Sequence, residues 1–419
     1  MRRLEVWWGA DRVGALEQDE SGRLGFRYGD DWLNGAGARP ISFSMPLTDE
    51  PYDDKAAHSF FGGLLPESDK RDIIARLFGI SPHNDYALLD AIGGDCAGAL
   101  TLLPPGQEPR VTAEKIAYEP LKPDQLGSIL DRLPSKPLLA GENGLRLSLA
   151  GAQDKLPVFV ADGGIALPLG DTPSSHILKP AIRAYPDTVL NEAFCLALAR
   201  SAGLYAVNSE ICGRAGREYL LVERYDRRLE PGRAAVRLHQ EDFCQALSVP
   251  SELKYQNEGG PSLADCFDLT RRATARPGAE LRKLLEGVLF NALIGNNDAH
   301  AKNFALLYWP WGLALAPFYD LVSTIVYEGL SPRMAMKIGG KYEFDELYPR
   351  HWERFAKEAG LGAPQVRRKL LDYCRGLPKL AAAKRDEFDA EGHRSSVINQ
   401  IVDLVENRCQ QVLNRFGES

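Results

Sequence analysis

The stretch Gly295-Asn-Asn-Asp-Ala-His-Ala-Lys-Asn-Phe304 follows directly on Glu280–Ile294, a segment whose apolar residues recur at the spacing of an amphipathic helix. Within this stretch, Asp298 and Asn303 are five residues apart. Phosphoryl transfer needs an Asp that orients the attacking hydroxyl and accepts its proton, and a neutral oxygen ligand for the magnesium that bridges the phosphates. A tight loop can place both side chains on one side of the chain. The stretch therefore favours a phosphotransferase built on this loop.

A second acidic residue, Asp320, follows Asn303 by 17 residues. The intervening segments Phe304–Tyr308 and Leu313–Ala316 have the pattern of a β-hairpin, so Asn303 and Asp320 could face one ion across paired strands. Magnesium prefers hard oxygen ligands, usually carboxylates and phosphate oxygens. Protein kinases have this arrangement of a loop Asp and Asn followed by a metal-binding Asp. The D-x-x-x-x-N spacing also arises by chance, which leaves a plain surface turn as the alternative.

Three elements upstream have counterparts in kinases. Small residues at 150–152 lie between two expected strands and suit a turn whose N–H groups cradle phosphate, with a structural hairpin as the alternative. Lys179 ends an apolar strand, like the kinase lysine that pairs the phosphates, and Glu192 on the next helix could pair with it or lie on a solvated face. The strand Leu220–Asp226 ends in polar residues, where a kinase hinge would bind adenine.

Taken together and in this order, these elements closely resemble the HipA family of bacterial toxin kinases, over essentially the whole chain. The motifs that carry the resemblance are Leu147-Ser-Leu-Ala-Gly-Ala-Gln-Asp-Lys155, His176-Ile-Leu-Lys179, Asn191-Glu192, Val222-Glu-Arg-Tyr-Asp-Arg227, His239-Gln-Glu-Asp-Phe-Cys-Gln245, Asp298-Ala-His-Ala-Lys-Asn-Phe304 and Tyr319-Asp320. Two further stretches look like the small first subdomain of that family: Ala38-Arg-Pro-Ile-Ser-Phe-Ser-Met-Pro46 and Phe60-Phe-Gly-Gly-Leu-Leu-Pro66.

The resemblance implies a role for each motif residue. Asp298 would be the proton acceptor, and Asn303 and Asp320 would hold magnesium. Ser148 would be an inhibitory autophosphorylation site, where a phosphate adds about −1.5 to −2 charges beside the phosphate loop; the alternative is an ordinary serine at a strand end. The residues that would bind ATP are Ala150, Gly151, Ala152, Gln153, Asp154, Lys155, Lys179, Glu223, Arg224, Tyr225, His300, Tyr319 and Asp320.

The resemblance also implies a fold and a biological role. The fold would be α+β: an atypical two-lobed protein-kinase-like fold with a β-rich N-terminal subdomain and a mostly helical C-terminal lobe. The activity would be that of a serine/threonine kinase using ATP and Mg²⁺, the toxin of a type II toxin–antitoxin pair, with an aminoacyl-tRNA synthetase as its target. Its partner would be a helix-turn-helix antitoxin of the HipB type, through which alone the chain would reach operator DNA.

Two other functions stay open at this point. The chain has no G-x-G-x-x-G loop, no H-R-D and no D-F-G. Its Asp-x-His-x-x-Asn spacing also resembles aminoglycoside phosphotransferases and lipid kinases, so a small-molecule kinase is one alternative. A catalytically silent co-repressor that binds the antitoxin is the other, although the intact set of Asp298, Asn303 and Asp320 argues against it.

Composition limits the partners. The 419 residues include 50 Lys and Arg against 57 Asp and Glu, a net charge of −7, which argues against nucleic-acid binding over the whole surface. A local basic cluster is either a solvated helix face or a site that touches DNA or a tRNA-bearing substrate; it consists of Arg271, Arg272, Arg276, Arg282 and Lys283.

The expected location is the cytoplasm. The 7 cysteines have neither a disulfide pattern nor zinc spacing, which favours a reducing compartment. The first residues lack the long apolar run of a signal peptide. No stretch reaches the roughly 18 apolar residues that span a bilayer, so no membrane contact is expected.

We expect four parts along the chain. They are a β-meander with helices over 1–106, a connecting segment over 107–140, a kinase-like N-lobe over 141–240 and a helical C-lobe over 241–419. The expected strands are Leu4–Trp8, Arg12–Glu17, Leu24–Tyr28, Ala97–Leu103, Leu145–Leu149, Leu156–Val160, Ile165–Leu169, His176–Lys179, Ser209–Cys212 and Tyr219–Arg224. The expected helices include 56–65, 68–77, 85–92, 124–133, 188–202 (with Asp187 as N-cap and Gly203 just past its end), 280–294 and 397–416.

Overall fold

The computed structural model describes residues 1–110, 117–142, 144–161, 163–214, 216–229 and 235–417. The chain divides into two compact units, the first made of Met1–Pro180 and Cys212–Glu252, the second of Ala181–Ile211 and Leu253–Ser419. Each unit is described by itself. The four-part division expected from the sequence stays a prediction.

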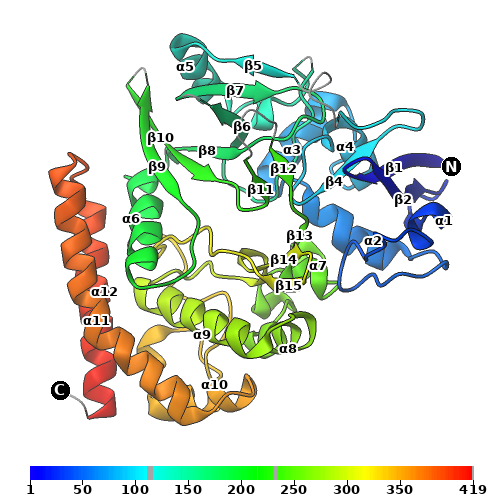
Figure 1. Cartoon of the computed structure of the whole chain (residues 1–419). Helices are drawn as coiled ribbons and strands as arrows, with labels where there is room; N and C mark the ends of the chain where they lie inside the picture. Colours follow the sequence, from blue (N-terminus) through cyan, green and yellow to red (C-terminus); the bar gives the residue numbers. More distant parts are fainter. Residues whose placement is uncertain (111–116, 143, 162, 215, 230–234, 418–419) are drawn as a thin grey trace. The chain divides into compact units, whose positions relative to one another are not determined.

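A four-stranded antiparallel sheet opens the first unit, in the order β3-β2-β1-β4 (Figure 1). Apolar residues such as Leu4 and Leu16 pair across the sheet and are fully buried. Buried and less buried residues alternate along β3, as expected of a strand with one face in the core. The strands are β1 (Arg2–Trp8), β2 (Asp11–Gln18), β3 (Leu24–Tyr28) and β4 (Leu100–Leu103). The helices of this segment are α1 (Asp30–Leu33), α2 (Asp54–Phe61), η1 (Gly62–Leu64), α3 (Ser68–Phe78) and α4 (Asp85–Ile92).

The second sheet has six strands in the order β5-β7-β6-β8-β10-β9. Its strands are β5 (Tyr118–Pro120), β6 (Leu156–Ala161), β7 (Gly164–Pro168), β8 (His176–Pro180), β9 (Ser209–Arg214) and β10 (Arg217–Glu223). Between β5 and β6 lie α5 (Pro123–Arg132) and η2 (Pro137–Leu139). The rest of the unit contains β11 (Arg227–Arg228), β12 (Val236–Arg237), β13 (Gln240–Asp242) and α7 (Phe243–Ala246), and η3 (Ser251–Leu253) leads out of it.

One hydrophobic core serves the whole first unit. It includes Leu4 and Phe61 from the first hundred residues as well as Leu156, Leu178 and Leu221 from the second sheet. The core therefore runs across the boundary predicted at residue 106. The segment 107–140 contributes strand β5 to the second sheet. One sequence prediction is wrong here: the strand expected at Leu145–Leu149 does not form, because this segment makes only isolated bridges, Asp95 with Leu147 and Leu145 with Gly170.

The second unit is mostly helical, as the sequence predicted. Its helices are α6 (Thr188–Ser201), η4 (Gln256–Glu258), α8 (Leu263–Ala273), α9 (Pro277–Ile294), η5 (Ala301–Asn303), η6 (Phe344–Glu346), α10 (Pro349–Glu358), α11 (Ala363–Ala390) and α12 (Ser396–Phe416). The predicted hairpin is confirmed as β14 (Ala305–Trp309) and β15 (Gly312–Leu315). The long helices α11 and α12 lie side by side (Figure 1). No helix in the described part of the chain is long and apolar enough to span a bilayer.

Helix α6 confirms the predicted segment but not its cap. Asp187 precedes the helix in the left-handed conformation, with φ of 49°, and its side chain makes no capping hydrogen bond. Its Oδ2 instead accepts a hydrogen bond from Ser395, 2.6 Å away, at the start of α12. The tertiary contact has replaced the local cap. Gly203 lies just past the end of the helix with φ of 84°, as predicted.

Candidate active site

The loop 295–303 begins where Gly295 ends helix α9. Gly295 has φ of 74°, and a Cβ here would lie 2.4 Å from Ile325 Cγ2 and 2.8 Å from Leu404 Cδ2, so the position requires glycine. Its carbonyl accepts hydrogen bonds from the backbone N–H groups of Thr324 and Ile325, 3.0 and 3.2 Å away. The loop is thus joined at its first residue to the segment that follows Asp320.

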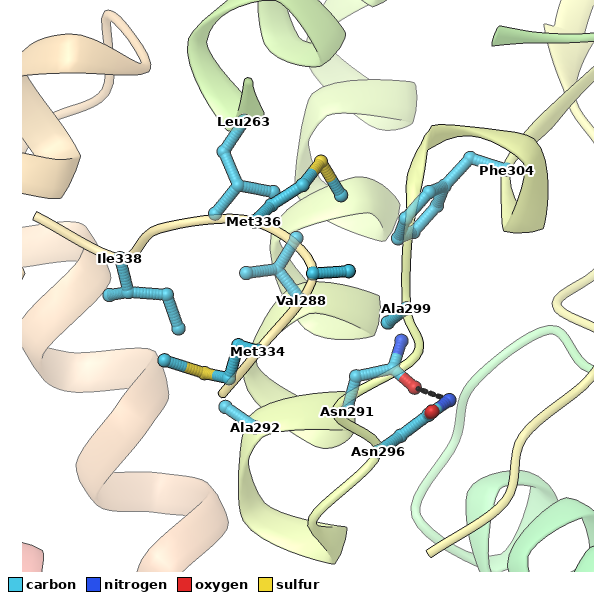
Figure 2. Close-up of a pocket in the computed structure, with 11 residues that line it drawn as sticks. Leu263, Val288, Asn291, Ala292, Asn296, Ala299, Phe304, Met334, Met336 and Ile338 are labelled. Atoms are coloured by element: carbon cyan, nitrogen blue, oxygen red, sulfur yellow. Dashed lines mark hydrogen bonds between the residues drawn. The ribbon is translucent and has the colours of Figure 1, made fainter. Parts of the chain in front are cut away.

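One buried side chain links the two acidic residues of the predicted site. Asn296 accepts a hydrogen bond from the backbone N–H of Asp298 (3.2 Å) and donates one to the backbone carbonyl of Asp320 (3.2 Å). It also donates to Asn291 Oδ1 on helix α9, 2.8 Å away, a pair that Figure 2 shows beside a small cavity of about 30 Å³. Asn296 is 4% exposed. Asn296 therefore fixes the backbone of Asp298 relative to that of Asp320.

The side chains predicted to act in catalysis belong to Asp298, Asn303 and Asp320, the residues around the hydrogen bonds of Asn296. The Asp298 carboxylate is exposed, and Tyr255 donates a hydrogen bond of 2.6 Å to its Oδ1. Asn303 donates through Nδ2 to the backbone carbonyl of Asp298 (3.0 Å), which leaves the carbonyl oxygen of its side chain directed elsewhere. Asp320 has φ of 51°, an uncommon backbone conformation for a residue with a side chain. Such strain is characteristic of functional positions, where the surroundings hold it.

The predicted magnesium ligands fit the ion chemically. An amide oxygen from Asn303 and a carboxylate from Asp320 are the hard donors that Mg²⁺ takes, the remaining positions being filled by phosphate and water. The described residues contain no group of three or more His, Cys, Asp or Glu side chains arranged around a metal. A site with only two protein ligands is the kind that Mg²⁺ forms together with a bound nucleotide.

Two neighbouring residues have structural contacts that the sequence did not predict. The Tyr319 hydroxyl donates to the backbone carbonyl of Lys302 (2.6 Å), so it braces the loop against the hairpin. His300 is 5% exposed, and its ring packs edge-on against Tyr255, with the centroids 5.2 Å apart. Their predicted contacts with nucleotide stay predictions.

Asn191 on helix α6 holds the segment that follows Asp320. Its Oδ1 accepts from the backbone N–H of Ser323 (2.9 Å), and its Nδ2 donates to the Ser323 carbonyl and to the Tyr327 hydroxyl. Asn191 is fully buried. In the sequence analysis Asn191 appeared only within the motif Asn191-Glu192, without a predicted role. A buried polar residue on an otherwise apolar helix face was the signal that could have identified it.

The predicted phosphate loop lies in the first unit, and its first and last residues are joined by a hydrogen bond. Lys155 donates to the backbone carbonyl of Ala150 (2.6 Å), and Asp154 pairs with Lys70 (2.8 Å). Gly151 has φ of 105°, and its carbonyl accepts from the Glu67 backbone N–H (3.3 Å). Ala152 is exposed and Gln153 half-buried. The glycine at the turn suits a phosphate cradle, but the charged side chains of the loop contact protein.

Ser148 is fully buried in this arrangement. Its hydroxyl donates to the backbone carbonyl of Leu64 (2.8 Å), and its backbone N–H donates to the Asp95 carbonyl (3.1 Å). Leu64 belongs to Phe60-Phe-Gly-Gly-Leu-Leu-Pro66, one of the stretches by which the chain resembles a family. That stretch therefore forms the surface on which the loop rests.

The adenine and lysine positions lie on paired strands. Lys179 on β8 is opposite Leu220 on β10, and Lys179 is 4% exposed. Its neighbours Leu178 and Leu221 belong to the core, so Lys179 lies on the other face of the sheet. At the end of the pair, Glu223 is opposite His176. Glu192 belongs to the second unit, so its pairing with Lys179 stays a prediction.

Arg224, predicted to bind the nucleotide, has its side chain in a buried ion cluster. Its guanidinium contacts Asp226 (2.7 Å) and Asp95 (3.2 Å), and Arg227 contacts Asp95 (2.8 Å). Burial alone would raise the pKa of Asp95, but the neighbouring Arg227, Arg224 and Arg237 hold it below its usual range. The backbone of Arg224 is engaged too, its N–H by the Ser175 carbonyl (3.0 Å) and its carbonyl by the Arg227 N–H (3.2 Å), so the predicted contact of Arg224 with the nucleotide stays a prediction. Tyr225 donates from its hydroxyl to Gln240 (2.5 Å).

The basic cluster on helices α8 and α9 is largely neutralised locally. Arg272 pairs with Asp268 (2.7 Å), Lys283 with Glu280 (3.0 Å), and Arg271 donates to the Ala359 carbonyl. Arg276 stacks over Trp311, 5.2 Å from the ring centroid. These contacts favour the interpretation of a solvated helix face.

Comparisons with known proteins show which family the chain resembles. The family model of the HipA-like C-terminal domain matches residues 147–381, and that of the HipA N-terminal domain matches residues 4–103. A Sinorhizobium fredii protein with the provisional name kinase Y4mE is 46% identical over 414 residues, covering 98% of this chain and 99% of its own. The serine/threonine-protein kinase toxin HipA of Shewanella oneidensis is 30% identical over 392 residues, covering 90% of this chain and 88% of its own.

A solved structure extends the match to three dimensions. It is the complex of HipA, HipB and operator DNA from Shewanella oneidensis, and one of its chains matches with a TM-score of 0.86 and 29% identity over 99% of this chain and 98% of that chain. The α+β, kinase-like fold expected from the resemblance is thereby confirmed. With its family model covering more than half of the sequence, the chain belongs to the HipA family of kinases.

Proposed function

We propose that the chain is a Mg–ATP-dependent serine/threonine protein kinase and the toxin of a HipA/HipB-type module. The observation that carries the proposal is the preformed frame around Asn296, which joins the backbone of Asp298 to that of Asp320. Family membership alone would also suit a catalytically silent relative, but a silent chain would have no need to keep these two acidic residues in one fixed frame.

The chain's own residues would act as follows. Asp298 would orient the acceptor hydroxyl and take its proton through the exposed carboxylate. Asn303 and Asp320 would hold Mg²⁺, which when bound neutralises charge on the phosphates. Lys179 and the backbone of the loop 150–155 would hold the phosphates, and the end of β10 at Glu223–Tyr225 the adenine. His300 and Tyr319 would line the nucleotide site.

The remaining parts of the proposal concern regulation and partners. Autophosphorylation of Ser148 would first require its hydroxyl to leave the Leu64 carbonyl, since a buried serine cannot reach a nucleotide. We propose a helix-turn-helix antitoxin as the partner because the structural relative was solved with HipB and operator DNA. An aminoacyl-tRNA synthetase as the target, and the cytoplasm as the location, are supported only by the family resemblance.

Phosphorylation of lysate proteins tests the proposal. The purified chain with Mg²⁺ and γ-labelled ATP should label Ser148 and a protein of the lysate, and mass spectrometry identifies both. Asp298→Ala and Asp320→Ala should each lower the rate by at least about 100-fold. Tyr205→Phe, which removes an exposed hydroxyl from the same unit, is the matched control. Full activity in either aspartate variant would refute the assigned roles, and label on small molecules alone would favour the small-molecule kinase.

A further inference from the structure

Tyr255 contacts the predicted proton acceptor directly. Its hydroxyl donates to Asp298 Oδ1 over 2.6 Å, a short distance typical of a hydrogen bond to a charged oxygen. In the part of the chain that the structure describes, the other oxygen, Oδ2, accepts no hydrogen bond. Fixing one oxygen determines the direction of the other, so the contact decides where an acceptor hydroxyl can be bound.

The loop that carries Tyr255 is built to hold this position. The Tyr255 carbonyl accepts from the backbone N–H of Gly260 (3.0 Å), where a Cβ would lie 2.0 Å from the Leu253 carbonyl oxygen. Gln256 donates its backbone N–H to the Ala335 carbonyl (3.2 Å), and its Oε1 accepts from the backbone N–H of Lys337 (2.7 Å). Tyr255 is therefore anchored on both sides and is not a mobile surface residue.

The ring of Tyr255 is also held from two directions. His300 packs edge-on against it at 5.2 Å, with the ring planes at 79°. Lys254 places its ammonium 5.4 Å from the ring centroid. Because His300 is itself part of the loop 295–303, the tyrosine ring and the carboxylate that it contacts share one support.

A cavity of about 500 Å³ opens beside this pair. Tyr255 and Asp298 both line it, together with Asn257, Glu258, Asn297, Thr324, Leu330, Ser331, Arg333, Met334, Ala335 and Tyr342. The volume is in the range of sites that hold a small molecule or a few residues of a peptide. The Asn297 carbonyl accepts from the Ala335 N–H (2.8 Å), so the far wall is joined to the loop 295–303 by a backbone hydrogen bond.

The cavity is lined by charges of both signs, the carboxylates of Asp298 and Glu258 and the guanidinium of Arg333. Arg333 lies 4.5 Å from the Tyr342 ring centroid, and Lys337 lies 4.9 Å from it. Glu258 is the one carboxylate other than Asp298 among the lining residues. Arg333 lines the cavity, whereas Lys337 does not. What selects the occupant is the exposed Asp298 carboxylate in the lining, which can accept a hydrogen bond from a hydroxyl placed in the cavity.

We propose that Tyr255 is a positioning residue for Asp298, and that the cavity they share receives the hydroxyl-bearing segment of a protein acceptor. The proposal rests on the kinase function proposed above and assigns its acceptor side. In it, Tyr255 holds Oδ1 while Oδ2 accepts the hydrogen bond of the substrate serine or threonine. Tyr255 transfers no proton itself.

The experiment uses this chain as its own substrate. The enzyme carries Ser148→Ala, so that it cannot label itself at that position, and the acceptor is the full chain with Asp298→Ala, which keeps Ser148. Adding Tyr255→Phe to the enzyme should lower kcat about 10- to 100-fold with the KM for ATP unchanged, because only the orientation of the carboxylate is lost. Tyr205→Phe is the control, an exposed tyrosine in the same unit. In an Asp298→Asn enzyme, Tyr255→Phe should have no further effect.

The cavity is tested by a second variant in the same assay. Arg333→Glu should raise the KM for the acceptor chain and leave the KM for ATP unchanged. Equal kcat for the enzymes with and without Tyr255→Phe, or additive losses in the Asp298→Asn enzyme, would overturn the positioning role. A change in the KM for ATP would overturn the acceptor assignment of the cavity. If the parent enzyme labels no protein at all, the proposed function fails and this inference with it.

Discussion

The two loops proposed to act on ATP are held in opposite ways. In the loop 295–303 the backbone is buried and bonded by Asn296, while the Asp298 carboxylate is exposed. In the loop 147–155 the proposed acting groups are engaged: the Ser148 hydroxyl is buried against Leu64, and Lys155 bonds the carbonyl of Ala150. The first loop is ready for chemistry as it stands. In the second, the Ser148 hydroxyl and the Lys155 ammonium would have to release these contacts before they could act.

Glycine substitutions should give the largest difference between the loops. Gly295→Ala would force a Cβ to within 2.4 Å of Ile325 at a φ of 74°, and we expect the free energy of unfolding to fall by about 3 kcal/mol. Gly151→Ala would meet only the ammonium end of Lys155, at 2.5 Å, which can move, so about 1 to 2 kcal/mol is expected. Urea unfolding of both variants measures this. Equal losses would show that the two loops are equally rigid.

The next effect concerns the buried serine. Ser148→Ala removes a hydrogen bond to the Leu64 carbonyl in a fully buried place and should cost about 1 to 2 kcal/mol of stability. The exposed Asp298→Ala, by contrast, should change stability by no more than about 0.5 kcal/mol. Thermal unfolding of the two variants under one condition makes the comparison. If Asp298→Ala lost more stability than Ser148→Ala, then Asp298 and not Ser148 would be the residue whose side chain is buried and bonded in the fold.

A smaller effect, of opposite sign, is expected at Asp320. Glycine relieves the strain of a φ of 51°, so Asp320→Gly should raise the free energy of unfolding by up to about 1 kcal/mol while abolishing magnesium-dependent activity. Asp320→Ala should lose the activity without the gain in stability. Unfolding and phosphorylation are measured on the same preparations. A destabilised glycine variant would mean that contacts of the Asp320 side chain outweigh the strain.

The smallest effect is a pH dependence at His58 on helix α2, in the same unit as the loop 147–155. His58 is hydrogen-bonded to Asp85 and faces Glu252, and these carboxylates raise its pKa to about 10. Because the folded pKa exceeds the ordinary value of 6.5, protonated His58 stabilises the fold fully below pH 6.5, and this contribution fades as the pH rises toward 10. The side chain is 35% exposed, so less than about 1 kcal/mol is expected. The melting temperature of the parent chain should therefore fall slightly more between pH 6.5 and pH 10 than that of a His58→Gln variant. An equal fall in the two proteins would contradict this assignment.

The sequence could name candidate residues for the site but not the contacts that support them. Residue type and spacing singled out Asp298, Asn303 and Asp320, whose roles stay predictions, and the hairpin predicted between Asn303 and Asp320 is confirmed. The bonds of Asn296 and Asn191 could not be read from local pattern, because both join segments far apart in the chain. The cap at Asp187 failed for the same reason, since Ser395 takes its carboxylate. Ser148 was predicted as a target, but its burial depends on Leu64, 84 residues away.

The buried ion cluster of Arg224, Arg227, Asp226 and Asp95 limits which parts of the chain can be exchanged between members of this family. Asp95 comes from the first hundred residues and its arginine partners from beyond β10. A chain cut between them, or one joined to the first subdomain of a relative with a different residue there, would leave charges without compensation in a dry interior, at several kcal/mol each. We therefore expect the first subdomain and the segment after β10, where we propose that the nucleotide binds, to be inherited together and to resist exchange as separate modules.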